Sequence, residues 1–211
     1  MTNPVRGRFV RKLEQLAQIS DEQLLAVFRA GDESAFARLV QRYEKELYNF
    51  LVRFLGRQSA AEDVFQETFL QVHISVDSFK TDRRFRPWLY TIAANKARDL
   101  QRQWTRRPTI QLTAIDDETG PSQLWDNLLQ DDTTAADVLE QKQQKEVVQK
   151  VVSQLPDALR EILILAYFNQ LSYKEMAEVL DVPLGTVKSR LHAAVAKFAK
   201  EYTKTTQDNN R

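Results

Sequence analysis

The chain has 211 residues, 43% of them hydrophobic and 28% charged, with a formal net charge of +1. These proportions are those of a folded globular protein, and the length allows one large domain or two small ones. The absence of cysteine excludes disulfides, thiolate catalysis and cysteine-ligated zinc. The apolar runs are too short for a membrane span, and the first residues lack the apolar core of a signal peptide. We therefore expect a cytoplasmic protein.

The small net charge hides a division of the chain into three parts. Residues 1–108 hold 19 Lys and Arg against 13 Asp and Glu, a net charge of +6. Residues 109–146 hold 2 against 9, a net charge of −7, and residues 147–211 hold 9 against 7, a net charge of +2. Two basic blocks separated by an acidic linker favour two modules that face nucleic acid, because clustered cations displace counterions from phosphates.

The first block predicts a series of helices after a basic tail at residues 1–19. With only five glycines and six prolines, the chain as a whole favours an all-α fold. A capping box at Ser20 and an N-cap at Asp32 begin two helices, and the second carries an apolar stripe with helical period as far as Gly56. A capping box formed by Ser59 and Glu62 begins the next helix. Its apolar residues are expected to be Val64, Phe65, Phe69, Leu70, Val72 and Ile74.

A basic and aromatic stretch closes the first block. Pro87 fits the first turn of a helix that follows a short loop. Between Lys80 and Arg107, nine basic residues stand against two acidic ones, with aromatic residues interleaved. Basic side chains follow phosphates and aromatic rings stack on unpaired bases, so this composition suits single-stranded or distorted DNA. A solvated basic face over an aromatic core explains the same composition.

After the acidic linker, helical periodicity returns near Ala135 and runs to Leu155, and Pro156 begins a further helix. A capping box of Ser172 and Glu175 then opens a short helix, and the turn Asp181-Val182-Pro183 leads into a longer one. Two helices joined by about three residues, with the second basic and rich in hydroxyls at its start, predict a helix-turn-helix. An ordinary helical hairpin is the alternative. The polar end, from residue 203 onward, is expected to be frayed.

Together the two blocks resemble the compact sigma factors of bacterial RNA polymerase, the extracytoplasmic-function (ECF) group. AEDVFQETF and WLYTIAAN, within residues 20–108, are similar to sigma region 2. GTVKSRL, within residues 147–203, is similar to sigma region 4. The resemblance implies two small helical domains joined by a flexible acidic linker at 109–146, with a polar tail at 204–211. It implies a protein without cofactor or chemistry of its own that directs core polymerase to promoters, with polymerase, promoter DNA and an anti-sigma factor as partners.

The resemblance also implies three sets of binding residues. The helix with AEDVFQETF would dock on the clamp of the largest polymerase subunit through Glu62, Asp63, Phe65, Gln66 and Glu67. A flipped base of the promoter's minus-ten element, and the phosphates beside it, would meet the loop and helix residues Phe79, Lys80, Arg83, Arg84, Asn95, Arg98 and Arg102. The second helix of the helix-turn-helix would enter the major groove of the minus-thirty-five element with Thr186, Lys188, Ser189, Arg190 and His192.

Two departures from the family pattern concern the minus-thirty-five set. Ala166 and Ala193 stand where many relatives carry basic residues, which predicts weaker or altered binding to that element. The carboxylates near Glu62 also suggest a metal site, but the only two histidines lie far apart and no second carboxylate helix has matching spacing.

Three other classes of function compete with the sigma-factor interpretation. A dimeric helix-turn-helix regulator would bind a palindromic site without polymerase. An anti-sigma or adaptor protein would occupy the same clamp without needing the basic stretch. A helical enzyme would need a nucleophile with a base, a phosphate loop or a metal set, and the sequence shows none of these patterns.

Overall fold

The computed structural model describes residues 18–80, 82–106 and 135–209. Within these ranges the chain is helical and contains no strand, which confirms the all-α prediction. The predicted basic tail up to residue 17 and most of the predicted acidic linker, residues 107–134, lie outside the described residues.

The first domain consists of α2 (Asp21–Arg29), α3 (Glu33–Leu55), α4 (Gln58–Ser75), the short 3-10 helix η2 (Val76–Ser78) and α5 (Phe85–Arg106). Helix α3 packs against α2, α4 and α5, and so forms the centre of this domain. The predicted boundaries of α3 are confirmed. Asp32 accepts a hydrogen bond from the N–H of Ser34, and Gly56 ends the helix with a φ of 72°, where a residue without Cβ is not strained.

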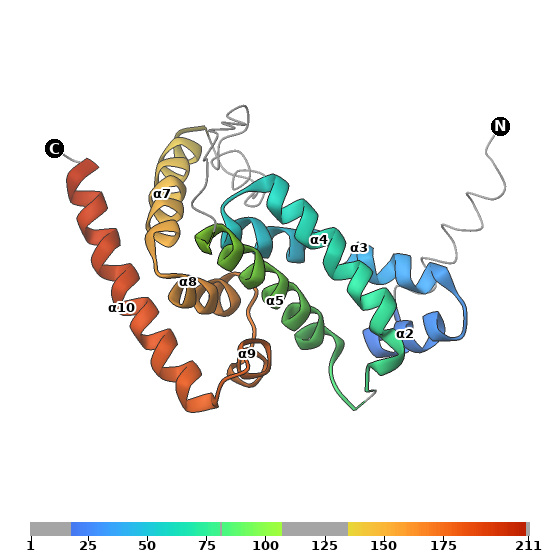
Figure 1. The fold of residues 1–211 in the computed structure, drawn as a ribbon. Coiled ribbons are helices and arrows are strands. Elements are labelled where there is room, and N and C mark those ends of the chain that lie inside the picture. The colour runs from blue at the N-terminus through green and yellow to red at the C-terminus, as the bar shows by residue number, and fades with distance from the viewer. Residues whose placement is uncertain (1–17, 81, 107–134, 210–211) are drawn as a thin grey trace, which may run out of the picture.

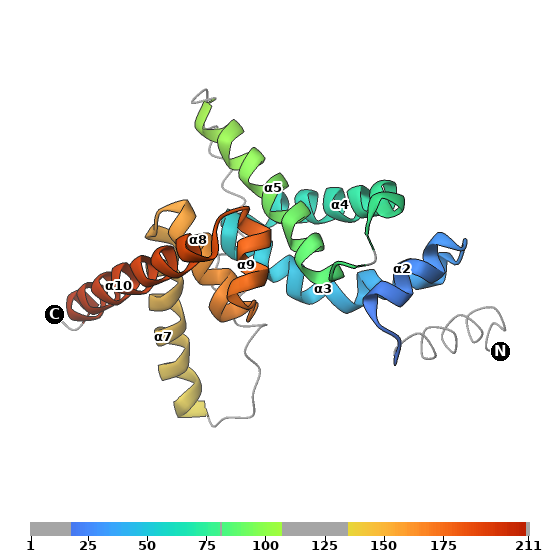
Figure 2. The same cartoon turned by 90° about the horizontal axis from the view of Figure 1, so that it is seen from below.

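The second domain consists of α7 (Ala135–Gln154), α8 (Asp157–Leu163), the π-helix η3 (Ile164–Phe168), α9 (Tyr173–Leu180) and α10 (Leu184–Asn209). Helix α10 packs against α7, α8 and α9. Figures 1 and 2 show α4 and α10 on opposite sides of the molecule, with α5 and α9 between them. The two domains share one continuous cluster of buried apolar side chains.

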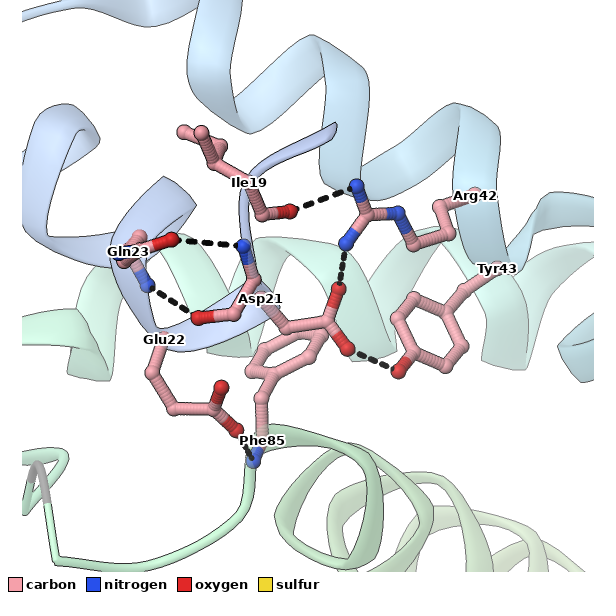
Figure 3. A network of polar contacts seen from close by, with 8 residues as sticks. Ile19, Asp21, Glu22, Gln23, Arg42, Tyr43 and Phe85 are labelled. Atoms are coloured by element: carbon pink, nitrogen blue, oxygen red, sulfur yellow. Dashed lines mark hydrogen bonds and ion pairs between the residues drawn. The ribbon is translucent and has the colours of Figure 1, made fainter. Parts of the chain in front are cut away.

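A polar network fixes the N-terminal ends of α2 and α5 (Figure 3). The carboxylate of Asp21 accepts hydrogen bonds from Arg42 and from the hydroxyl of Tyr43, both on α3. The carboxylate of Glu22 accepts the backbone N–H of Phe85, the first residue of α5, at 3.0 Å. Burial acts to raise the pKa of Glu22, but the hydrogen bond from Phe85 helps to hold this pKa below its usual value. Glu22 therefore caps the helix that carries predicted DNA-binding residues.

Two expectations need correction. Ser59 and Glu62 do not form a capping box, because α4 begins earlier, at Gln58, and Arg57 caps it without a side-chain bond. On the same helix, the apolar residues Leu70 and Ile74 are 60% and 67% exposed. The polar tail is helical as far as Asn209, since α10 continues through it. The helix expected from near Ala135 is confirmed as α7, which therefore begins within the segment 109–146.

Candidate nucleic-acid interface

The predicted helix-turn-helix is present as α9, a three-residue turn and α10. The capping box is complete, because Ser172 accepts the N–H of Glu175 and the Glu175 carboxylate accepts the N–H of Ser172. Asp181 ends α9 in the left-handed conformation at φ 51°, which aspartate tolerates. Pro183 lies directly before α10, and its carbonyl accepts the N–H groups of Thr186 and Val187. The turn therefore needs no ligand to hold its shape.

The five predicted minus-thirty-five residues occupy the first turns of α10. Lys188, Ser189 and His192 are exposed, while Thr186 and Arg190 are half-buried. Val187 is fully buried and fixes the helix against the domain core. Three exposed polar side chains on the first turns of the second helix of a helix-turn-helix are placed to contact base edges or phosphates at a major groove.

Removing the capping hydroxyl in Ser172→Ala is expected to lower the free energy of unfolding by about 1 kcal/mol, because the N–H of Glu175 loses its acceptor. Urea unfolding monitored by circular dichroism measures the change. Ser153→Ala is the matched control, since the Ser153 hydroxyl bonds to a carbonyl in the same helix and the exchange to alanine favours that helix. Equal losses in the two variants would contradict the capping role.

Arg29 holds the loop that precedes α5. Its guanidinium donates to the carbonyl of Val76 at 2.8 Å and to the carbonyl of Phe79. The Phe79 side chain is buried, 4% exposed, with its ring centroid 4.8 Å from that of Trp88. In this conformation the ring offers no free face to a base, so base stacking by Phe79 stays a prediction. Lys80, Arg83 and Arg84 are exposed.

On α5, Asn95 and Arg98 act as a pair. Asn95 is exposed, and its side-chain carbonyl accepts a hydrogen bond of 2.6 Å from Arg98. This bond orients the amide group of Asn95 and leaves its N–H donors for another partner. One turn further, Arg102 forms an ion pair of 2.5 Å with Asp99, and both side chains are exposed. The side chains of Lys80, Arg83, Arg84, Asn95 and Arg102 are thus exposed along α5 and the loop before it, and their role in minus-ten binding stays a prediction.

The five predicted polymerase-binding residues lie on α4, and four are exposed: Glu62, Asp63, Gln66 and Glu67. Phe65 is half-buried and lines a shallow groove of about 480 Å³ between α3 and α4, with Tyr48, Glu62 and Gln66. Leu70 and Ile74 continue the same face of α4, because they follow Asp63 by seven and eleven residues. This helical spacing from Asp63 was the signal in the sequence that could have placed Leu70 and Ile74 on the exposed face of α4, and it was missed.

Three buried polar residues were also missed: Tyr90 on α5, Glu161 on α8 and Asn169 after η3. Burial raises the pKa of the Glu161 carboxyl to about 7, while Arg98 and Arg190 act to lower it. These two arginines belong to the predicted minus-ten and minus-thirty-five sets. Glu161 therefore lies between the two predicted DNA surfaces, a relation that appears only when the domains are packed.

The helix-turn-helix domain packs beside a second helical domain, whose helix α5 carries basic and amide side chains. This architecture defines a two-domain DNA-binding protein that acts in transcription. The family model of Sigma-70 region 2 matches residues 39–107, and that of Sigma-70, region 4 matches residues 145–198. The ECF sigma factor SigW of Bacillus subtilis is 34% identical over 82% of this chain and 91% of its own length. The ECF sigma-E factor of Haemophilus influenzae is 33% identical over 84% and 92%. CnrH, solved in complex with the cytosolic domain of CnrY, has a TM-score of 0.61 and 28% identity over 85% of this chain and 95% of its own.

The chain belongs to the ECF sigma factors of RNA polymerase, which bind the polymerase and direct it to promoters. This confirms the resemblance and does not favour an independent dimeric regulator. Among the described residues, no helix is long and apolar enough to span a bilayer. In the same part of the chain, no group of three or more histidine and carboxylate side chains is placed to hold a metal ion.

Proposed function

We propose that this sigma factor holds polymerase with α4 and promoter DNA with α5 and α10, and has no chemistry of its own. The observation that carries this proposal is the division of exposed polar groups among three separate helices. Among the proposed contact residues, the acidic ones lie on α4, and the basic and amide ones lie on α5, in the loop before it and on the first turns of α10. A polymerase partner also implies a cytoplasmic protein.

The exposed face of α4 is proposed as the polymerase contact, through Glu62, Asp63, Phe65, Gln66 and Glu67. The groove beside Phe65 supports this assignment, because it offers an apolar hollow beside carboxylates. Leu70 and Ile74 extend the surface, since exposed apolar side chains in line with a polar patch are typical of protein interfaces. The partner face that fits is a basic helix with apolar residues at one end.

The minus-ten contact is proposed for the loop and for α5, through Phe79, Lys80, Arg83, Arg84, Asn95, Arg98 and Arg102. An amide with free donors recognises a base edge, and the arginines hold phosphates. The minus-thirty-five contact is proposed for Thr186, Lys188, Ser189, Arg190 and His192 on α10. CnrH was solved with a second protein, the cytosolic domain of CnrY, and we infer a protein partner for this chain as well; the family resemblance implies that this partner is an anti-sigma factor.

Reversing one charge tests the polymerase contact. Asp63→Lys is expected to weaken binding to core polymerase about tenfold, because a cation replaces an exposed carboxylate opposite a basic surface. Titration of labelled protein with core polymerase measures the affinity, and promoter-dependent transcription should fall with it.

Glu33→Lys is the matched control, with the same change of charge at an exposed position on α3. It is expected to bind polymerase like the wild type. If Asp63→Lys also binds normally, α4 is not the docking helix. If the wild-type chain neither co-elutes with core polymerase nor supports a promoter-dependent transcript, the function itself is wrong.

A further inference from the structure

Helix α5 packs against α9 of the second domain as well as against its own domain (Figure 2). It therefore has an interaction surface whose occupant in this structure is the helix-turn-helix domain of the same chain. Two proposed minus-ten residues, Arg84 and Arg98, belong to that surface. Arg84 lies 3.5 Å from the carboxylate of Glu175 on α9, and Arg98 donates to the carbonyl of Val179 at 3.4 Å.

The centre of the surface is a buried hydrogen bond between the domains. The side-chain amide of Asn169 donates to the hydroxyl of Tyr90 at 2.8 Å, and both residues are almost fully buried, at 2% and 0% exposed. Arg86 joins the same site by donating to the carboxylate of Glu46 on α3 and to the backbone carbonyl of Asn169. Such bonds favour a single docking geometry, because a shifted arrangement of the docked domains would leave these buried polar groups without hydrogen-bond partners.

A buried carboxylate engages the DNA-binding arginine directly. Glu161 has a side chain that is only 4% exposed, and one of its oxygens lies 3.8 Å from Nε of Arg98. Arg98 is therefore drawn toward the second domain by a charge as well as by a carbonyl. A phosphate that took Arg98 would have to compete with both.

Two arginines also lie over aromatic rings across the domain boundary. The guanidinium of Arg53, on α3, lies 4.4 Å from the ring centroid of Phe168, and that of Arg160, on α8, lies 5.8 Å from the ring of Phe54. These pairs cross the domain boundary in both directions. Burial lowers the pKa of Arg53 to about 10.

We propose that in the free chain the second domain occupies α5 and competes with minus-ten DNA for it, so that the sigma factor inhibits itself until the domains separate. The closure is carried by Tyr90, Asn169 and Glu161, none of which is assigned to DNA or polymerase. The competition with DNA rests on the proposed minus-ten function; the closure does not.

The test uses the full chain, which has no native cysteine. Spin labels at S59C and A196C, both exposed and in different domains, report the distance between the domains. Tyr90→Phe removes one buried hydrogen bond across the interface and is expected to raise the ratio of open to closed chain about tenfold. Asn169→Ala removes the same bond from the other side and should give the same shift. Tyr43→Phe is the matched control, because its hydroxyl bonds to Asp21 within the first domain.

Binding of a fluorescent single-stranded oligonucleotide of mixed sequence is measured on the same variants. The wild type and Tyr43→Phe should show one narrow distance, and Tyr90→Phe should add a longer one and bind the oligonucleotide up to about tenfold more tightly, since only the open fraction binds.

Three outcomes would overturn all or part of this proposal. A wild-type distance distribution as broad as that of Tyr90→Phe would contradict closure. A shift toward the open form without tighter DNA binding would contradict the competition. If no variant binds the oligonucleotide while the wild-type distance stays narrow, the competition and the minus-ten assignment both fail, and closure stands.

Discussion

The free energy of unfolding of the wild type is expected to fall by about 2.5 kcal/mol between pH 5 and pH 8, and the variant Glu161→Gln is expected to lose this dependence. Glu161 is 3% exposed, and burial raises the pKa of its carboxyl to about 7. The folded protein therefore binds a proton that the unfolded chain has already released. This contribution to stability is fully present below the unfolded pKa near 4.5 and is lost as the pH rises through about 7.

The groups around Glu161 determine how large the effect becomes. Arg98 and Arg190 favour the charged carboxylate, and Asp157 disfavours it, but none of them offsets burial. One carboxylate oxygen has an ion pair with Arg98 at 3.8 Å and no hydrogen bond within the described residues. At high pH the charged form is therefore poorly satisfied, and the amide variant is expected to be the more stable protein.

Urea unfolding at several pH values, for wild type and Glu161→Gln side by side, isolates this group because all other groups titrate in both proteins. Glu178→Gln, an exposed carboxylate of the same domain, is the control, and surface changes of this kind are usually within about 0.5 kcal/mol. Parallel pH profiles for wild type and Glu161→Gln would show that Glu161 titrates normally.

Local signals in the sequence predicted most of the helices. The capping boxes at Ser20 and Ser172, the N-cap at Asp32 and the left-handed cap at Gly56 lie where they were expected. Each depends on hydrogen bonds between residues two to four positions apart, which a sequence displays directly. Ser59 was misassigned because its spacing to Glu62 fits a capping box, but the helix had already begun at Gln58.

The contacts between the domains could not be predicted in this way. In the sequence, Tyr90 is one of several aromatic residues in a basic stretch. Its hydrogen-bond partner, Asn169, lies 79 residues further along the chain, so no local pattern connects the two. Glu161 had no local feature that distinguished it from a surface carboxylate. Its burial depends on how α8 packs beside α5 and α10, which periodicity does not encode. The same limit explains Leu70 and Ile74, apolar residues whose face of α4 is left uncovered.

Asn95→Ala is expected to reduce promoter-dependent transcription by between about tenfold and a hundredfold, because a base-edge acceptor left without its hydrogen bond in the complex costs about 1–3 kcal/mol. The physical reason lies in the bond from Arg98, which fixes the carbonyl side of the amide and leaves its donors directed outward. Alanine removes both the base contact and the acceptor that orients Arg98. Initiation from a linear promoter template, with polymerase in excess, measures the loss.

Lys188→Ala, on the upstream side of the promoter, is expected to cost only about two- to threefold, as a single exposed phosphate contact does. Ala166 in η3 and Ala193 in α10 stand where the family resemblance predicts basic residues, so the second domain is expected to have fewer cations with which to hold DNA. The control for Asn95→Ala is Gln103→Ala, which changes another exposed polar residue of α5 and is expected to leave promoter-dependent transcription unchanged. A larger loss in Lys188→Ala than in Asn95→Ala would reverse the order of the two contacts. Promoter preference would then depend on α10, and the amide of Asn95 would serve only to position Arg98.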